Sequence, residues 1–591
     1  MNHRAATDPE QLIAPRGEIL FAPLSVGQAA AIAAIMLLAY LPAMRAGFIW
    51  DDDSYVTENA ALKAPDGLRR IWLEPESTPQ YYPLVFTALR IEYGLWGLHP
   101  AGYHVVNILL HAANALLLWR VLLLLRVPGA WVAALLFGVH PVQVESVAWV
   151  AELKNVLSGF FYFAAFWAAL RFYLGTEPGL RRWVVYGGAF LLFACALLSK
   201  TATCSLPAAI LLILWWKRGR VSRGEVLTLL PFFALGAALA FHTAILEKGH
   251  VGAVGAEWEL SFLQRVLLAG RALWFYAAKL VWPAGLTFVY PRWQLDPGAA
   301  WQYLFPAAAI AVLVILWLLR GRLGRGPLAA ALFFALTLAP ALGFVNVYPM
   351  RFSFVADHFQ YLASIGLIVA VAAAVASWRV VKAHMRATGV LCAAILAALG
   401  ALTWRQCLVY RDAETVWRDT LCKNPDALMA LDNLGEILVK KGMKEQRPAR
   451  AAALYGEAIK CFDKAIALDP GDAVGYNNRG RAYVRVGRHA LALRDYDRAI
   501  TLNPYFFQAY SNRGNVYVRA GLYDLALRDY DRAIALNPKL AEAYGNRAVA
   551  HYRMKQYNEA LADVKTAQEL GDQPHPDFLK ALRQAAERAE Q

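Results

Sequence analysis

Two different patterns of apolar and polar residues divide the chain. Long apolar runs alternate with short polar connections from residue 24 to residue 404, whereas residues 426–571 show shorter amphipathic runs. A helix needs about 20 apolar residues to cross a bilayer. The sequence therefore predicts an all-α protein with a polytopic membrane bundle followed by a helical soluble domain. About eleven spans are expected, at residues 24–44, 103–125, 129–149, 155–174, 183–199, 201–216, 226–246, 301–319, 327–345, 361–379 and 388–404.

Two further apolar segments do not fit a simple span. Residues 263–283 contain Arg265, Arg271 and Lys279. Three cations in a lipid-facing helix would each cost about 2.5–3.5 kcal/mol unless they snorkel or pair. We interpret this segment as an interfacial or re-entrant helix, with a twelfth span as the alternative. Residues 81–98 are amphipathic and rich in aromatic residues, which predicts a second interfacial helix.

Basic residues fall on every second connection between the predicted spans, as the positive-inside rule requires of the cytoplasmic face. These residues are Arg4, Arg16, Arg126, Arg181, Arg182, Lys217, Arg218, Arg220, Arg223, Arg320, Arg322, Arg325, Arg379, Lys382 and Arg386. No small-residue cleavage site follows the first apolar run, so we expect a retained helix and a cytoplasmic segment 1–23. An odd number of spans then places the soluble domain outside. A bacterial inner membrane with periplasmic repeats is favoured, and a luminal domain in the endoplasmic reticulum is the eukaryotic equivalent.

The soluble domain repeats every 34 residues. Pro470, Pro504 and Pro538 share this spacing, and small residues recur with the same period at Gly480 and Gly514. This period and pattern are typical of tetratricopeptide repeats, each made of two short helices. We predict a linker helix at 405–425, about four repeats at 426–571 with some eleven extra residues in the first, and a polar tail at 572–591.

Two sets of polar residues follow the repeat period. One set could hold the backbone of an extended peptide through side-chain amides, or could equally satisfy neighbouring repeats. Its members are Asn433, Asn478, Asn512 and Asn546. The other set predicts structural ion pairs between the two helices of each repeat. Its pairs are Arg479 with Asp495, Arg513 with Asp529, and Arg547 with Asp563.

Composition supports the division into two parts. Residues 1–404 contain 30 Lys and Arg and 20 Asp and Glu, whereas the shorter remainder contains 29 and 24. The mean hydropathy of the chain is +0.36 and its net charge is +15. Because much of the positive charge lies in short loops, it indicates orientation in a membrane and no nucleic-acid partner is expected. Six scattered cysteines without a CxxC pair exclude a disulfide scaffold and a zinc ribbon.

Candidate chemistry begins directly after the first span, where Asp51, Asp52 and Asp53 follow Trp50. Three adjacent carboxylates repel one another, which raises at least one pKa and supplies a base near neutral pH. A solvated loop or a helix cap is the structural alternative, and for this run taken alone it is the better one.

The outer ends of other predicted spans add titratable and polar residues. The region thus contains acids suited to base catalysis and cations suited to binding a phosphate. Charged residues at membrane depth are rare and by default functional, so we interpret them as candidate site residues. The residues are His104, Asn107, His111, His140, Glu145, Glu152, Lys154, Lys200, Arg351, Asp357 and His358. The two histidines of the second span lie seven residues apart, so we expect no metal site, with a divalent metal kept as the minor alternative. No Walker loop, GxGxxG or GxSxG motif supports a nucleotide-driven or hydrolase function.

Several of these segments together resemble the transmembrane-and-tetratricopeptide O-mannosyltransferases and their bacterial relatives in the glycosyltransferase C superfamily. The segments are GFIWDDDSYVTEN (47–59), YYPL (81–84), WGLHPAGYHVVNILLH (96–111), FGVHPVQVESVAWVAELKNVLSGFF (137–161), LLSKTATCSLP (197–207) and RFSFVADHFQYLASIG (351–366). The resemblance covers nearly the whole chain. Two features depart from the family pattern: Lys154 and His358 stand where arginine is expected, and Asp53 extends the usual acidic pair.

The resemblance implies a glycosyltransferase that uses a polyprenyl phosphate-sugar donor on the non-cytoplasmic side. The implied reaction is a single inverting displacement, with Asp51 or Asp52 as the base. Arg351 would neutralise the leaving phosphate, together with Lys200 or Lys154. Glu145 and Asp357 are further candidates for orienting the acceptor or the cations, and Glu145 is placed with the catalytic acids. For His104 and His111 we favour a structural role.

Three functions are compatible with the sequence. The first is transfer of a mannose-like sugar to Ser or Thr of an extracytoplasmic protein that the repeats recruit. The second keeps the donor but uses a glycan or lipid acceptor, with a partner protein docked on the repeats. The third is a membrane-anchored scaffold without activity, which the crowding of charged groups at the span ends disfavours.

Overall fold

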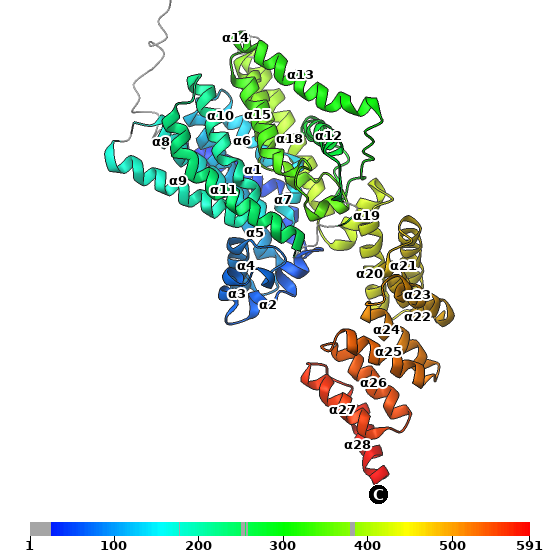
Figure 1. Ribbon diagram of the computed structural model, residues 1–591. Helices are drawn as coiled ribbons and strands as arrows, with labels where there is room; N and C mark the ends of the chain where they lie inside the picture. The colour runs from blue at the N-terminus through cyan, green and yellow to red at the C-terminus, as the bar shows by residue number, and fades with distance from the viewer. Residues whose placement is uncertain (1–24, 177, 250–254, 256–257, 379–383, 591) are drawn as a thin grey trace, which may run out of the picture. The chain divides into compact units, whose positions relative to one another are not determined.

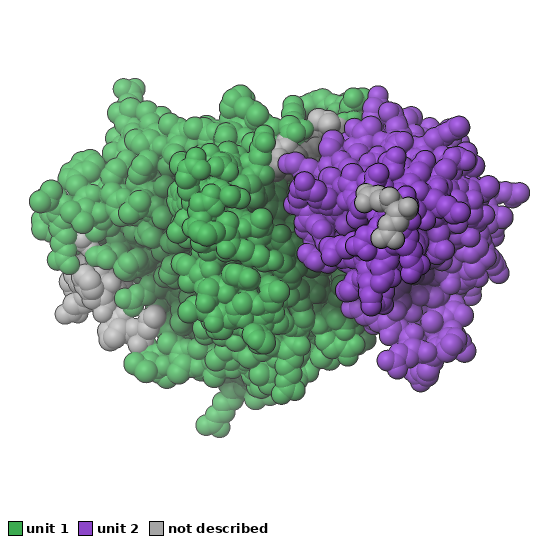
Figure 2. Space-filling view, turned by 90° about the horizontal axis from the view of Figure 1, so that it is seen from below, with its two compact units in different colours: residues 1–423 green, residues 424–591 purple. Residues whose placement is uncertain are grey.

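The computed structural model describes residues 25–590 except 177, 250–254, 256–257 and 379–383, and its regular elements over these residues are all helical (Figure 1). The all-α prediction is confirmed. Two compact units divide the chain, at residues 1–423 and 424–591 (Figure 2). The basic residues Arg4, Arg16, Arg379 and Lys382, and the predicted segment 1–23, lie outside the described residues.

The first unit is a multi-pass membrane domain. Its main helices are α1 (Val26–Ala39), α5 (Pro100–Leu124), α6 (Ala130–Val139), α8 (Leu153–Leu174), α9 (Gly179–Ser199), α10 (Leu206–Arg218), α11 (Arg223–Gly249), α12 (Phe262–Val281), α13 (Leu304–Leu318), α15 (Gly326–Leu338), α16 (Ser364–Ser377) and α18 (Met385–Val409). Each of the eleven predicted spans overlaps one of these helices. Within the described residues, however, six helices are long and apolar enough to cross a membrane, or seven with one bent pair, so a count of eleven is not confirmed.

The shorter apolar helices explain this difference. Helices α1, α15 and α16 fall short of the length for a full span, and the segment predicted at 201–216 begins with a 3-10 turn before the thirteen-residue α10. Residues 405–423 of the predicted linker 405–425 belong to the first unit, because α18 continues to Val409 and α19 (Ala413–Lys423) follows it there.

The bent pair consists of α6 and the helical residues Pro141–Ala148. The two parts meet at a break at His140-Pro141, with a bend of 54° between them. Proline lacks the N–H that the next helical turn would need, and the His140 ring accepts a hydrogen bond from the Val142 amide instead. The chain then passes through short turns, η5 (Pro141–Gln143), α7 (Val144–Ala148) and η6 (Val150–Glu152), before α8 begins. The break therefore brings Glu145 and Glu152 to the same end of the bundle.

The two predicted interfacial segments are helical. Residues 81–98 form α4 (Pro83–Trp96), which packs with the short helices α2 (Ala60–Lys63) and α3 (Gly67–Leu73) near the start of α5. Residues 263–283 form α12, which is not among the helices apolar enough to span. Its Arg265 donates to the Asn346 side chain and its Arg271 lies over the ring of Trp293, so these cations have local partners. An interfacial position for both helices stays a prediction.

The second unit consists of four helical hairpins and a final helix. The hairpins are α20 (Leu428–Lys444) with α21 (Pro448–Leu468), α22 (Ala473–Arg485) with α23 (His489–Leu502), α24 (Phe507–Arg519) with α25 (Tyr523–Leu536), and α26 (Ala541–Arg553) with α27 (Tyr557–Glu569). The extra residues of the first repeat lengthen both of its helices. The predicted polar tail forms α28 (Pro576–Glu590), whose buried Leu582 packs on the last hairpin. The tail is therefore a capping helix.

A small residue and a large one meet inside each hairpin. A Cβ placed on Gly480 would lie 2.7 Å from the ring of Tyr496, and one on Gly514 would lie 2.8 Å from Tyr530. The fourth hairpin has Ala548 at the glycine position and Val564 at the tyrosine position. The two positions thus vary together to keep the packed volume nearly constant.

This packing predicts that Gly514→Ala destabilises the repeats by about 1–3 kcal/mol, because the new methyl group collides with Tyr530. The double variant Gly514→Ala/Tyr530→Val should recover part of that loss, since it reproduces the natural pair of the fourth hairpin. Urea unfolding of residues 424–591 followed by circular dichroism measures both. A single variant as stable as the wild type would contradict the collision.

Candidate active site

A buried carboxylate with two lysines lies at the centre of the candidate site. Glu152 is fully buried at the end of η6. Its Oε1 lies 2.9 Å from Lys154 Nζ, and its Oε2 lies 3.5 Å from Lys200 Nζ. Removing a charge from water is costly unless an opposite charge lies beside it. The two lysines and one glutamate leave one net positive charge in this place.

Asn155 holds Lys200 against α8. Its Oδ1 accepts a hydrogen bond of 2.6 Å from Lys200 Nζ, while its Nδ2 donates to Ser146 Oγ and to the His358 carbonyl. One amide therefore connects the cation to the break after α6 and to the turn η12 (Asp357–Gln360). Nothing in the residue pattern singled out Asn155, because a polar residue at a helix start is ordinary.

Glu145 anchors the turn that carries His358. Its Oε2 accepts the His358 backbone N–H at 3.0 Å, and its Oε1 lies 3.0 Å from His358 Nδ1. The neighbouring Asp357 accepts from the hydroxyl of Tyr290 at 3.1 Å. Burial, and then the nearby charge of Glu145, hold the pKa of Asp357 well above its usual range. Both acids are buried and held by these contacts, and their orienting role stays a prediction.

The acidic run divides into three different environments. Asp52 is fully buried, and its two oxygens accept the backbone N–H groups of Ile49 at 2.8 Å and Ala151 at 2.7 Å. Asp53 is exposed and accepts a hydrogen bond from Thr57. Asp51 is half-buried, lies within the electrostatic range of Lys154, and makes no side-chain hydrogen bond within the described part of the chain.

These environments set the pKa values. Burial raises the pKa of Asp51 to about 6, with Lys154 lowering it and Glu152 raising it. Burial also raises the pKa of Asp52 to about 8, against the two backbone hydrogen bonds. Repulsion from Asp51 and Asp53 also raises the pKa of Asp52, as expected, but burial is the larger cause. Burial lowers the pKa of Lys200 to about 8, which Glu152 opposes.

A strained backbone precedes Asp51. Trp50 has φ of 42°, a left-handed conformation that costs a residue with a Cβ about 1–2 kcal/mol. Its indole packs against Trp149, Phe288 and Trp417, with ring centroids 5.6, 5.6 and 6.1 Å away. This aromatic cluster holds the conformation that turns Asp51 and Asp52 in different directions.

A chain of hydrogen-bonded polar side chains, which the residue pattern does not predict, extends from Lys154. Lys154 Nζ donates to the Tyr55 hydroxyl at 3.4 Å, Tyr55 donates to Gln80 at 2.7 Å, and Gln80 donates to Glu247 at 3.0 Å. In the sequence, Tyr55 lies close to the acidic run and Gln80 lies next to the YYPL segment. No other feature of the sequence predicts that their side chains are hydrogen-bonded to each other.

The histidines and Asn107 mainly connect elements. His111 lies 2.8 Å from the Tyr361 hydroxyl and 3.0 Å from the Gly138 carbonyl, and Asn107 donates to the Trp149 carbonyl. His104 is fully buried beside the backbone of residues 46–47, and His140 lies 3.0 Å from the carbonyl of residue 280.

The structure does not place every predicted cation in this cluster. Arg351 is exposed on the turn η11 (Tyr348–Arg351), with its guanidinium 5.6 Å from the ring of Phe352. The contacts around Glu152 come from Lys154, Lys200 and His358. Within the described residues, no group of three His, Cys, Asp or Glu side chains is arranged to bind a metal ion.

The repeats contain a polar cavity of about 390 Å³ that is separate from this site. Of the four predicted amides, only Asn512 lines this cavity. Asn433 donates a hydrogen bond to a carbonyl of its own helix, and Asn477 lies on the cavity wall in place of Asn478. Three arginines on the first helices of two successive repeats also line the cavity, together with one carboxylate residue, Glu542, and among the described residues none of the three forms an ion pair. They are Arg481, Arg485 and Arg519.

The arginines of the predicted ion pairs have a different role. Arg513 forms a two-point pair with Asp529 and also contacts Asp497 of the preceding hairpin. Arg479 and Arg547 repeat this geometry. The prediction of pairs within each repeat agrees with the structure, which adds a link between neighbouring hairpins.

Comparison with known proteins gives two kinds of similarity. Family models described as "TPR repeat" and "Tetratricopeptide repeat" match residues 480–521, 514–555 and 461–494. Mouse "Protein O-mannosyl-transferase TMTC3" is 31% identical over 145 residues, which are 23% of this chain and 16% of that protein. The Drosophila melanogaster Tmtc3 protein is 33% identical (22% of this chain, 17% of that protein), and human TMTC4 is 30% identical (23% and 22%).

These matches confirm the resemblance to the transmembrane-and-tetratricopeptide O-mannosyltransferases, and the chain spans about a fifth of the length of these curated relatives. Among solved structures, the chain is similar to the MamA protein, at 26% identity over 27% of this chain and 80% of that one, with a TM-score of 0.23. It is also similar to the first TPR of RPAP3 bound to an HSP90 peptide, at 30% identity over 21% and 94%, with a TM-score of 0.18.

The central carboxylate predicts a specific loss of stability. Glu152→Gln leaves Lys154 and Lys200 without their buried counter-charge, which should cost about 3–5 kcal/mol. The double variant Glu152→Gln/Lys154→Met should be more stable than the single one, because it removes one of the two uncompensated cations. Thermal unfolding in detergent, followed by tryptophan fluorescence, compares the three proteins. Equal unfolding temperatures for wild type and Glu152→Gln would refute the central role of Glu152.

Proposed function

We propose that this protein is a membrane glycosyltransferase that moves a mannose-like sugar from a polyprenyl phosphate-sugar to a Ser or Thr hydroxyl of an extracytoplasmic protein. The observation that carries the proposal is the position of a half-buried, weakly acidic Asp51 beside the cluster of Glu152, Lys154 and Lys200. The names of the curated relatives support the same reaction. An outward-facing site also suits a donor carried by the lipid bilayer.

The chemistry divides between Asp51 and the lysines. Asp51 takes the proton of the acceptor hydroxyl while the hydroxyl oxygen forms a bond to the anomeric carbon. The bond from that carbon to the phosphate oxygen breaks, and its electron pair leaves on the polyprenyl phosphate. Attack and departure on opposite faces of the sugar invert the anomeric configuration.

The charge balance of the cluster fits this leaving group. The donor is a phosphate diester with one negative charge, and the cluster retains one positive charge. We assign the phosphate to Lys200 and Lys154 rather than to Arg351, because these two ammonium groups share Glu152, whereas Arg351 is exposed on a separate turn. Fixed cations of this kind stabilise charge that develops in the transition state.

Asp51 suits the base role better than its neighbours. A base must reach the proton that it removes. Both oxygens of Asp52 accept backbone hydrogen bonds in the interior, and Asp53 is exposed beyond the cluster. We therefore assign catalysis to Asp51, and to Asp52 the positioning of the loop against residue 151.

The repeats would recruit the acceptor through their polar cavity. Arginine side chains without a carboxylate partner attract acidic residues, and the neighbouring amides of Asn477 and Asn512 bind a peptide backbone. We infer that preferred acceptors carry an acidic segment near the modified hydroxyl.

The base assignment predicts that Asp51→Asn lowers the rate of sugar transfer by about 10²–10⁴-fold without a change in folding. Asp53→Asn is the matched control and should stay within about threefold of the wild type. Initial rates with a radiolabelled polyprenyl phosphate-sugar and a Ser/Thr peptide measure this effect. Full activity of Asp51→Asn would exclude Asp51 as the base, whereas absence of sugar transfer in the wild type would favour the scaffold.

The pKa values predict a bell-shaped dependence of transfer on pH. The base must be deprotonated, so the rate rises as the pH increases through about 6, the pKa of Asp51. The phosphate-binding lysine must be protonated, so the rate falls as the pH increases through about 8, the pKa of Lys200. Lys200→Arg should remove the alkaline decline, because arginine stays charged. An unchanged decline in this variant would assign the alkaline limb to another group.

The repeat cavity predicts an effect on acceptor affinity. Arg481→Gln/Arg519→Gln should raise KM for an acidic acceptor peptide about tenfold with little change in kcat, because only binding far from the chemistry is lost. Arg498→Gln/Arg532→Gln removes the same charge from exposed positions on the second helices and serves as the control. If both double variants change KM equally, the effect is one of net charge and the cavity is not the binding place.

A further inference from the structure

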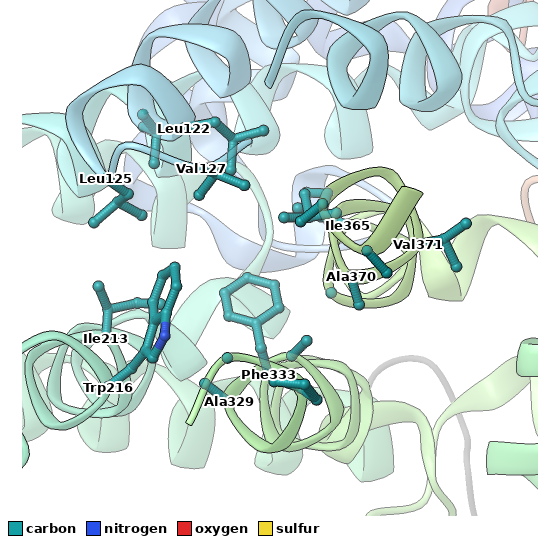
Figure 3. Close-up of a pocket in the computed structure, with 18 of the residues that line it drawn as sticks. Leu122, Leu125, Val127, Ile213, Trp216, Ala329, Phe333, Ile365, Ala370 and Val371 are labelled. Carbon is teal, nitrogen blue, oxygen red and sulfur yellow. The ribbon is translucent and has the colours of Figure 1, made fainter. Parts of the chain in front are cut away.

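An apolar cavity of about 590 Å³ lies inside the membrane unit (Figure 3). It opens between α5, α8, α10, α15 and α16, and almost all of its lining atoms are apolar. The side chains that face one another across it include Leu122, Ile213, Trp216, Phe333 and Ile365. Such a wall suits hydrocarbon, since it has few groups that could bind water or a sugar.

The cavity and the candidate active site occupy opposite ends of the same helices. On α5, the cavity residue Leu118 lies eleven residues after Asn107, or roughly 17 Å along the axis. On α8, Phe166 lies the same distance beyond Asn155. The basic loops place this end on the predicted cytoplasmic face, away from the phosphate site at Lys200.

Three basic residues surround the end of the cavity. Arg126 stands between the lining residues Leu125 and Val127, Lys217 directly follows Trp216, and Arg325 directly precedes Gly326. All three are exposed, and none of them has a carboxylate partner among the described residues. Lys217 donates to the carbonyl of residue 125, which brings two of the three segments together.

The charged residues nearby do not neutralise these three cations. Arg218 is engaged by Glu225, and that carboxylate also accepts the Ser222 backbone N–H. Arg126 lies close enough to Lys217 for their like charges to interact. Like charges that lie together repel one another, and an anion that binds between them relieves this repulsion.

We propose that this cavity binds an anionic glycerophospholipid of the membrane leaflet opposite the active site. Its acyl chains occupy the apolar cavity, and its phosphate lies among Arg126, Lys217 and Arg325. Cationic groups at the bilayer surface attract anionic headgroups in this way, and Trp216 stands at the depth where indoles favour the interface. The phosphate of the polyprenyl donor does not explain these three cations, because it must lie at the other end of the helices.

The test measures lipid binding to the full-length protein in detergent by native mass spectrometry. Dioleoyl phosphatidylglycerol is the anionic probe, and dioleoyl phosphatidylcholine has the same chains with a zwitterionic headgroup. The variant Arg126→Gln/Lys217→Gln/Arg325→Gln should weaken binding of the anionic lipid by about tenfold or more and leave the zwitterionic lipid unchanged. Ala370→Trp, which fills the cavity, should weaken binding of both lipids.

The control Arg220→Gln/Arg223→Gln/Arg322→Gln removes three exposed charges from the same face and should bind both lipids as the wild type does. Equal binding of the two lipids to the wild type, or equal losses in the triple variant and the control, would overturn the proposal. Displacement of phosphatidylglycerol by a polyprenyl phosphate that depends on Lys200 would instead assign the cavity to the donor. The triple variant changes exposed side chains only, so it decides the question even if Ala370→Trp does not fold.

Discussion

A carboxylate buried between two lysines is the constraint on which the rest of the membrane unit depends. Glu152 has no access to solvent, so its charge is tolerable only because Lys154 and Lys200 lie beside it. These residues come from separate turns, and the fold must therefore bring the end of α9 to the start of α8. The two lysines and the glutamate together keep one excess positive charge in this place.

The interruption of helices serves this constraint. A continuous helix through His140 and Pro141 would carry Glu145 away from the cluster, whereas the bend and the following short turns return it toward His358. Asp52 also helps to position this region, because its carboxylate accepts a hydrogen bond from the backbone N–H of Ala151, next to Glu152. Irregular backbone is tolerated at this depth since side chains satisfy its polar groups.

The sequence allowed a correct prediction of the helical class and the repeats, because hydrophobic period and a 34-residue spacing are local signals. It also singled out Glu152, Lys154 and Lys200, which lie together in the structure, while their role in a reaction stays a prediction. It did not distinguish Asp51 from Asp52, since neighbouring identical residues differ only in what packs against them. The roles of Arg351 and of the regular Asn positions stay predictions; Arg351 lies outside the contacts around Glu152, and Asn512 is the one of the four amides on the cavity wall. Burial and partner choice are tertiary properties, and no spacing reports that Asn477 rather than Asn478 lies on the cavity wall.

Cations lie close together at both ends of the helix bundle, and their repulsion is reduced in a different way at each end. At the active-site end, two cations are buried, so a carboxylate must offset one of them and the remaining charge is fixed in position. At the other end, the cations Arg126, Lys217 and Arg325 are exposed, and water makes their repulsion bearable without an internal acid. A fixed charge suits a transition state with one geometry. A flexible, hydrated set of charges suits a lipid headgroup, whose position varies with the membrane around it.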